Sequence, residues 1–187
     1  MSRQMWQESL AWAVADGTAI SNTTTETIIF PNVTIPANYM QDGRAIRLQA
    51  YGRWSIQAAA NTLYFAVRWG GVSGTILAQS PNFTGSGSAI TSAPWALDVI
   101  LQTRSNGSSG SIFAMGRSWL STGVGPTVGT VTNYLADAIM SSTGTTVPAA
   151  VTVDLTADTA LSLTAKWGTA NASNAVTGHV YTIESLN

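Results

Sequence analysis

The chain has 187 residues, and among them are no cysteine, a single histidine and very few charged side chains. The absence of cysteine excludes disulfide bonds and thiolate metal sites. Charged residues make up 9% of the chain, whereas a soluble domain usually carries about 25%. Ser, Thr, Asn, Gln and Gly therefore hydrate the surface. A surface with so little charge keeps proteins apart poorly, which favours a chain that works inside an assembly.

The chain also lacks basic character, because its formal net charge is −1 and its sequence pI is about 5.6. It therefore has no strong positive field for nucleic acid or for an anionic membrane, and we expect neither as a partner. No run reaches the roughly 18 apolar residues of a membrane helix, and the N-terminus lacks the apolar core of a secretory signal. The basic residues are nearly all arginines, which suit hydrogen-bonded protein contacts because the planar guanidinium forms several bonds at once.

Residues that usually carry catalysis are too scattered to indicate an active site. The only histidine, His179, lies inside an expected strand, where packing or hydrogen bonding is its usual role. Asp154 and Asp158 flank an expected turn, where aspartate is common for conformational reasons. The glycine-rich stretch 70–74 lies between strands and opens no helix, so it does not match a phosphate-binding loop. We therefore expect no catalytic residue, no metal site and no cofactor, and we predict that the protein is not an enzyme.

A regular alternation of apolar and polar residues organises the chain around residues 61–80. One side of this extended segment carries only apolar side chains, namely Leu63, Phe65, Val67 and Trp69. Such alternation is typical of a strand with one face packed on a core. Residues 70–74 then supply glycines for a turn, and residues 75–78 return as a partner strand. The pattern predicts a β-hairpin.

The same alternation predicts the other strands along the chain. We expect them at residues 26–35, 45–54, 95–104, 112–120, 151–155, 161–167 and 178–186. Pro31 places the first of these at an edge or a bulge. Two further pairs of strands are expected to be hairpins, 95–104 with 112–120 and 151–155 with 161–167. Residues 80–94 are expected to form a long loop, and residues 134–140 a strand or a short helix.

About eight strands with connections of varied length predict an all-β fold, specifically a jelly-roll-like antiparallel β-sandwich. Tryptophan is frequent, and three of the seven, Trp69, Trp95 and Trp167, fall on the apolar sides of their strands. We predict that these three lie in the core. The alternation leaves Trp54 and Trp119 undecided between the core and the surface.

Residues 1–16 are the only segment with helical spacing. Met5, Trp6 and Leu10, with Ala13 or Val14 beyond, recur at three-to-four spacing, and Trp12 lies seven residues after Met5 on nearly the same side. We expect a short helical or extended arm over residues 1–20, followed by a β-sandwich domain over residues 21–187. Large apolar side chains are costly to leave in water. The arm therefore either packs on its own domain or reaches onto a neighbouring protein.

Four passages read together resemble a family of small virion proteins from tailed bacteriophages. They are TAISNTTTETIIFPNVTIPANYMQDGRAIRLQA, LYFAVRWGGVSGTILA, RSNGSSGSIFAMG and LTAKWGTANASNAVTGHVYTIESLN. The resemblance runs from about residue 18 to residue 187 and consists of strands and turns without a catalytic motif. It implies a capsid decoration (cement) protein or a head-fibre or tail-fibre module, usually trimeric and of jelly-roll type. It also implies a place on the capsid exterior of the virion, after assembly in the bacterial cytoplasm.

On this resemblance we expect a structural virion protein that binds the outside of the phage head and stabilises contacts between major capsid subunits. The candidates for capsid contact are the arm residues Met5, Trp6, Leu10 and Trp12. The candidates for the subunit interface of a homotrimer lie on strand faces opposite the apolar ones, namely Arg47, Arg68 and Arg117. The alternative is a fibre or adhesin module whose loops contact host surface glycans.

Overall fold

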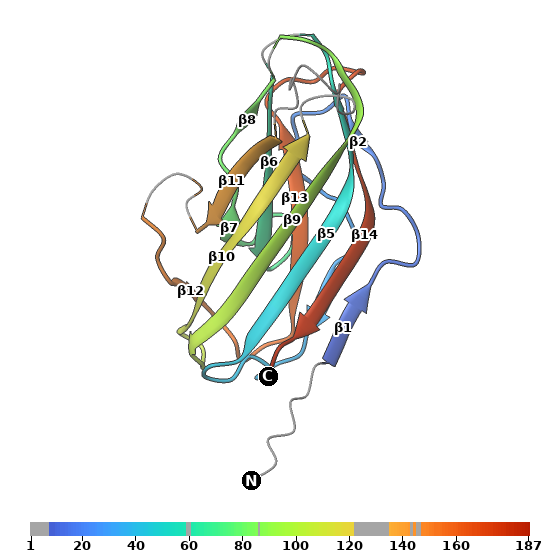
Figure 1. Ribbon diagram of the computed structural model, residues 1–187. Helices are drawn as coiled ribbons and strands as arrows, with labels where there is room; N and C mark the ends of the chain where they lie inside the picture. Colours follow the sequence, from blue (N-terminus) through green and yellow to red (C-terminus); the bar gives the residue numbers. More distant parts are fainter. Residues whose placement is uncertain (1–7, 59–60, 86, 122–134, 143, 145–146) are drawn as a thin grey trace.

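The computed structural model describes residues 8–58, 61–85, 87–121, 135–142, 144 and 147–187, and it shows an all-β protein (Figure 1). These residues form fourteen strands, and no helix occurs among them. Within the same ranges, therefore, no helix is long and apolar enough to cross a membrane. Every strand pairing in the described part of the chain is antiparallel. The prediction of an all-β antiparallel fold is confirmed.

The long strands form one layer, which we call the front sheet. Its order is β1 (Glu8–Trp12), β14 (Ala175–Ser185), β5 (Ala45–Ile56), β9 (Ile90–Ser105), β10 (Gly110–Ser121) and β11 (Leu135–Ser141). Strands β9 and β10 are the hairpin that the sequence predicts. Two short strands extend this layer, β2 (Ile20–Ser21) beside β14 and β12 (Val151–Val153) beside β10.

A second layer, the rear sheet, lies behind the first in Figure 1. Its order is β7 (Thr75–Gln79), β6 (Thr62–Trp69), β13 (Thr159–Trp167) and β3 (Thr27–Ile28). The short β4 (Val33–Ile35) pairs with β13, and β8 (Phe83–Thr84) pairs with β6. The two layers are joined where Ser141 of β11 pairs with Gln79 of β7. The result is a β-sandwich whose sheets share one edge.

The core fills the space between the sheets with inward-facing side chains from both. The largest fully buried ones include Trp167, Phe65, Ile46, Leu48, Leu63, Leu97 and Leu101. The rings of Phe65 in the rear sheet and Trp95 in the front sheet lie 4.8 Å apart between their centroids, so they join the two layers directly. Burying one large apolar side chain contributes about 1.5–3 kcal/mol. Burial between the layers is therefore the main source of stability.

The tryptophans confirm the alternation argument. Trp69, Trp95 and Trp167 are buried as predicted, and each indole N–H donates to a backbone carbonyl oxygen at 3.0–3.1 Å. Of the two undecided residues, Trp54 lies in the core and donates to the carbonyl of Ser121, whereas Trp119 is half-buried on the outer face of the front sheet. A buried indole needs such a partner because its N–H would otherwise be unsatisfied.

The helical form expected for the N-terminal arm is wrong over its described part, and the extended form is correct. Residues 8–12 form β1, which pairs with β14 from Glu8 opposite Ser185 to Trp12 opposite Thr182. The reason is that β14 would otherwise leave an edge of unpaired backbone groups, which β1 satisfies. Residues 1–7, including Met5 and Trp6, lie outside the described residues.

The expected pairing of residues 151–155 with residues 161–167 is also wrong. β12 pairs with β10 in the front sheet, and β13 pairs with β6 in the rear sheet. The segment between β12 and β13 carries the chain from the front sheet to the rear sheet. It turns at Asp154, whose carboxylate accepts a hydrogen bond from the Thr156 N–H at 2.8 Å. A local turn signal does not show whether the chain returns to the same sheet.

Three smaller expectations are resolved by the strand bounds. The expected strand at 26–35 is split into β3 and β4 around Pro31, which has no N–H for a ladder bond. The expected loop at 80–94 contains β8 and the first residues of β9. Of the two alternatives for residues 134–140, the strand is correct over residues 135–141.

Two glycines face each other inside the front sheet where aromatic rings pack on the backbone. Gly178 of β14 lies opposite Gly52 of β5. A Cβ atom on Gly178 would lie 2.3 Å from the ring of Phe30. Phe30 in turn stacks on Tyr181, with ring centroids 4.7 Å apart. The absence of a side chain at residue 178 therefore makes room for the aromatic pair that covers this part of β14.

Replacing Gly178 with alanine should destabilise the fold, because Phe30 cannot keep its place against an added methyl group. We expect Gly178→Ala to lower the free energy of unfolding by about 1–3 kcal/mol, the usual cost of overpacking. Thermal or denaturant unfolding measures this. The matched control is Thr177→Ala in the same strand, which should change stability by less than about 0.5 kcal/mol. Equal stability of the Gly178 variant and the wild type would contradict this account of the packing.

Candidate interaction surface

The acidic residues and the histidine of the described chain are dispersed over both sheets and the segments that connect their strands. Among these residues no group of three or more His, Cys, Asp and Glu side chains is arranged to hold a metal ion. His179 lies at a bulge in β14, with its Nδ1 2.7 Å from a carboxylate oxygen of Asp16. Beside it, the Gly17 N–H donates to the carbonyl of Gly178 at 2.9 Å. These contacts fasten the segment after β1 to β14.

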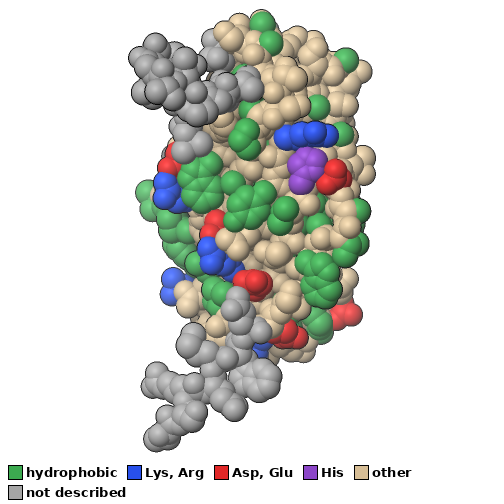
Figure 2. Space-filling model, turned by 45° about the vertical axis from the view of Figure 1, so that its right-hand side comes forward, with side chains coloured by type: hydrophobic (Ala, Val, Ile, Leu, Met, Phe, Trp, Pro, Cys, Tyr) green, Lys and Arg blue, Asp and Glu red, His purple; other side chains and the backbone are tan. Residues whose placement is uncertain are grey.

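A broad surface with mixed apolar and charged side chains covers the outer side of the front sheet. Five large apolar side chains there are 40–52% exposed, namely Tyr51, Ile100, Met115, Ile139 and Val180. Cross-strand pairing places them on one side, because Tyr51 lies opposite Val180, Ile100 opposite Met115, and Ile139 opposite Arg117. We call this surface the front face. Figure 2, which brings part of it forward, shows hydrophobic side chains interspersed with small groups of basic and acidic ones.

Four charged residues form a slanted row across the front face. The row is made of Arg47 on β5, Asp98 on β9, Arg117 on β10 and Asp137 on β11. Arg47 Nε donates to Asp98 at 2.9 Å, and Arg117 forms an ion pair with Asp137. Asp98 lies directly opposite Arg117, so the charges alternate in sign from β5 to β11. Gln49 also donates to Asp98, at 3.3 Å.

Ion pairing stabilises the charged state of both arginines on this face. The hydrogen bond to Asp98 raises the pKa of Arg47 above its already high usual value, in spite of slight burial. The hydrogen bond to Asp137 raises the pKa of Arg117 in the same way. The row is therefore neutral as a whole and keeps its two positive charges over the whole accessible pH range.

Aromatic rings lie next to these charges. The guanidinium of Arg117 lies over the ring of Trp119, 5.3 Å from the centroid, and that of Arg104 lies over Phe113 at 5.1 Å. A shallow hollow of about 310 Å³ opens between β9 and β10, lined by Asp98, Ile100, Met115, Gly116, Arg117 and Trp119. Tyr, Trp, Phe, Met and Arg are the residues enriched in protein interfaces, and Lys is depleted. The single lysine of the chain, Lys166, lies on β13 of the rear sheet.

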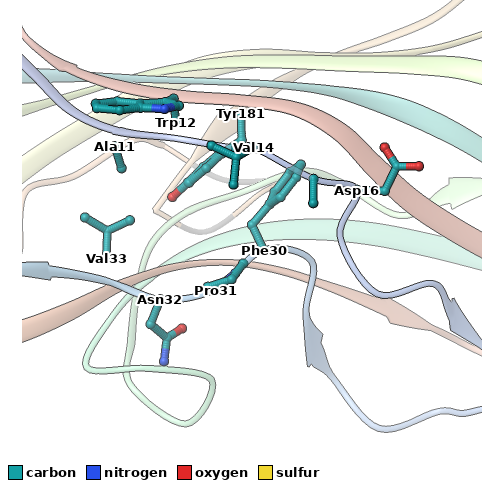
Figure 3. Close-up of a pocket in the computed structure, with 11 residues that line it drawn as sticks. Ala11, Trp12, Val14, Asp16, Phe30, Pro31, Asn32, Val33 and Tyr181 are labelled. Atoms are coloured by element: carbon teal, nitrogen blue, oxygen red, sulfur yellow. The ribbon is translucent and has the colours of Figure 1, made fainter.

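A second apolar surface, the N-terminal edge, adjoins β1. Trp12 at the end of β1 is 63% exposed and Val14 just beyond it is 90% exposed. Below them runs a groove of about 230 Å³ between residues 11–16 and residues 30–33 (Figure 3). Figure 3 shows the rings of Phe30 and Tyr181 side by side in this groove, while the Asp16 carboxylate points away from it.

The described candidates for capsid contact differ in their accessibility. Leu10 packs against the core of its own domain, so it supports the fold. Trp12 is the residue of this group that is free to meet a partner. Ala13 N–H donates to the carbonyl of Tyr181 at 2.9 Å, so the arm continues along β14 beyond the strand itself. From residue 8 onward the arm therefore belongs to the front sheet, and part of the apolar surface of this segment remains exposed.

The three candidate interface arginines are divided between the two sheets. Arg47 and Arg117 lie together on the front face, where their role in a subunit interface stays a prediction. Arg68 lies on the rear sheet and is only 13% exposed at its side chain. It donates to both carboxylate oxygens of Glu26, at 2.5 and 2.7 Å, and to the carbonyl of Gly74 at 2.7 Å. Its donors are engaged within the chain, so we leave Arg68 out of the candidate surface.

Glu26, which directly precedes β3, contacts two other strands of the rear sheet, β6 and β13, in one polar cluster. Besides Arg68 on β6, it accepts bonds from the hydroxyls of Tyr64 at 3.0 Å and Thr164 on β13 at 2.5 Å. Burial alone would raise the pKa of Glu26, but the bonds from Arg68, Thr164 and Tyr64 outweigh it and hold the pKa below its usual value of 4.5. Burial and the bond to Glu26 raise the pKa of Tyr64.

The apolar members of the front face are absent from the sequence-based candidates. Ile100, Met115 and Ile139 occupy the outward phase of their strands, where polar residues are expected. That mismatch can be read in the sequence, and apolar residues that gather in the polar phase of neighbouring strands form a candidate interaction surface. Which strands lie side by side, and hence which of these residues meet, is decided by the sheet order.

No family model, curated protein or solved structure matches this chain. The candidate surfaces are therefore assigned from geometry and composition.

The Glu26 cluster predicts a pH-dependent loss of stability. A pKa that is lower in the folded protein than in the unfolded chain stabilises the fold above about pH 4.5, and this contribution is lost as the pH falls through the lowered value. We expect Glu26→Gln to destabilise the protein by about 2–3 kcal/mol at pH 7, because Arg68 loses its charged partner. The difference from wild type should shrink below pH 4.5.

Chemical denaturation at pH 7 and at about pH 3 measures both effects. The control is Glu8→Gln, which removes an exposed carboxylate bonded to the Tyr39 hydroxyl at 2.9 Å and should cost less than about 0.5 kcal/mol. A Glu26 variant as stable as wild type at pH 7 would show that the cluster contributes no net stability.

Proposed function

We propose that this chain is a structural virion protein, a capsid decoration (cement) protein that binds the outside of a tailed-phage head and strengthens contacts between major capsid subunits. The observation that carries the proposal is the N-terminal edge, where Trp12 and Val14 present exposed apolar side chains on a segment held rigidly against β14. A rigid apolar projection is suited to fill a pocket or seam between shell subunits, since little ordering entropy is lost on binding.

The composition and the resemblance of the sequence support the same proposal. The chain has few charges, nearly all its basic residues are arginines, and the charge row of the front face is neutral. These features favour contact with protein over nucleic acid or membrane. The sequence passages that resemble phage virion proteins span both sheets of the sandwich. We infer no enzymatic role.

The proposed mechanism is thermodynamic. The protein binds the assembled lattice in preference to a loose capsid subunit, so bound copies stabilise the shell by mass action. An oligomer engages several sites at once, and modest contacts then multiply through effective concentration. Each contact would bury about 1,000 Å² or more to be specific.

The test is a binding assay on phage heads that lack the decoration protein, with a variant in which the edge loses its apolar side chains. Trp12→Ser combined with Val14→Ser should weaken binding at least about tenfold, because two large apolar side chains together contribute several kcal/mol. Deletion of the arm is a poorer test, since residues 8–16 also pair with β14 and cover Tyr181. Co-sedimentation with heads over a range of concentrations gives the apparent dissociation constants.

The matched control is Val147→Ser, which removes a side chain 84% exposed outside the edge and should leave binding unchanged. Thermal unfolding of both variants verifies that the fold is retained. Wild-type protein that does not bind heads saturably would refute the decoration role. If the edge variant binds heads saturably and as strongly as the wild type, the capsid contact lies on another surface of the protein.

A glycan-contacting fibre or adhesin module is the second candidate, and one observation favours it. Tyr51 on β5 and Trp119 on β10 lie in one cross-strand row with the small Ala96 between them. Two strand spacings, about 10 Å, separate rings that could stack on alternate sugars of an extended glycan. The test measures binding of host-surface glycans and of phage heads to the wild-type protein and to Trp119→Ala. Glycan binding by the wild type alone, with no binding of heads by either protein, would favour this candidate.

A further inference from the structure

We infer that the front face binds a second copy of this chain in a twofold, face-to-face contact, because its row of charges is complementary to itself. The inference concerns a surface other than the N-terminal edge and does not depend on what the edge binds. Arg47, Asp98, Arg117 and Asp137 run in the order plus, minus, plus, minus from β5 to β11. Read from the other end, the same row is minus, plus, minus, plus.

The positions of the four residues fit a twofold axis as well as their signs do. Asp98 and Arg117 are directly opposite each other at the middle of the row. Arg47 lies two residues farther along the strands in one direction, opposite Ile100. Asp137 lies two residues farther in the other direction, opposite Trp119. The row is therefore symmetric about its midpoint in position and antisymmetric in charge. A twofold axis that lies in the plane of the contact and crosses the row at right angles through its midpoint sets Arg47 against Asp137 of the second copy. It brings Asp98 within about one strand spacing of Arg117 of that copy.

The same rotation brings apolar side chains together. Ile100 on β9 lies opposite Arg47, and Ile139 on β11 lies opposite Arg117. With the regular spacing of antiparallel strands, the operation sets Ile100 against Ile139 of the second copy. Met115, beside Ile100, adds a flexible side chain to this contact. The apolar pairs exclude water and strengthen the ion pairs between them.

The size of the surface predicts a reversible dimer. Five strands about 4.8 Å apart, each with about six residues, give a footprint of roughly 500 Å² per copy. A typical stable complex buries about 800 Å² per partner, so we expect association that depends on concentration. Glu184 lies opposite Arg47 on β14, at the margin of the face, and adds one negative charge outside the row.

Two charge-swap variants test the inference. Arg117→Asp with Asp137→Arg changes the row to plus, minus, minus, plus, which is no longer complementary to itself. Arg47→Asp with Asp98→Arg gives minus, plus, plus, minus, which also repels its own copy. Each variant keeps one pair of opposite charges at the exchanged positions, but two like charges then lie opposite each other on β9 and β10. Thermal unfolding therefore verifies the fold of each variant. Read in the antiparallel sense, however, the two altered rows are complementary to each other.

The measurement is sedimentation velocity from about 1 to 200 μM at low salt, where exposed charges are least screened. We expect wild-type protein to shift from monomer to dimer as its concentration rises, and each swap variant to stay monomeric. An equimolar mixture of the two variants should recover a dimer. About 0.5 M salt should weaken both the wild-type dimer and the mixed dimer.

The outcome of this experiment decides the inference. Wild-type protein that is monomeric throughout, a wild-type trimer as the sequence resemblance implies, or swap variants that still dimerise alone would each refute it. Folded swap variants that fail to dimerise with each other would refute the twofold arrangement of charges.

A further variant covers the case in which a swap variant does not fold. Ile100→Asp places a charge in the apolar part of the face and should abolish the dimer, whereas Val72→Asp at a similarly exposed position outside the front sheet should leave it intact. Dimerisation of the Ile100 variant at wild-type concentrations would refute the inference without any swap variant.

Discussion

The pairing of β14 with β5 on one side and β1 on the other is the contact on which the rest of the structure depends. It joins the last strand of the described chain to its first strand and to the central strand β5, so the front sheet is complete only when the C-terminal strand is in place. The aromatic pair Phe30 and Tyr181 packs at this strand, and His179 fastens the N-terminal segment to it. Contacts of such sequence separation are costly in loop entropy and typically slow folding.

Charged residues, although few, are used in two different ways. In the rear sheet, Arg68, Glu26, Tyr64 and Thr164 form a part-buried cluster whose donors and acceptors satisfy each other, and its role is to hold β3 to β6 and β13. On the front face, Arg47 and Arg117 are paired with carboxylates but remain accessible. The first arrangement stabilises the monomer. The second places two neutral ion pairs on the surface, and their charges of both signs can recognise a surface of matching pattern without attracting nucleic acid.

The two candidate surfaces have different physical characters. The N-terminal edge is narrow and apolar, and it is held by backbone bonds to β14. The front face is broad, with alternating charges and half-buried aromatic rings. In our proposal the edge contacts the capsid, and in our inference the front face contacts a second copy, so one chain can join a neighbour and the shell at the same time. Such a division of contacts gives a small protein the multivalency that a cement requires.

The sequence alone determined the local structure, because alternation fixes which face of each strand is apolar. The pairing of β6 with β7, the pairing of residues 95–104 with residues 112–120 and the burial of Trp69, Trp95 and Trp167 followed from that pattern. It did not determine the partner of β12, the strand form of residues 8–12 or the separation of Arg68 from Arg47 and Arg117. Those depend on which strands lie side by side, and backbone hydrogen bonds between strands are the same whatever their side chains. Only the packing of the two sheets selects one order, and with it which side chains share a face.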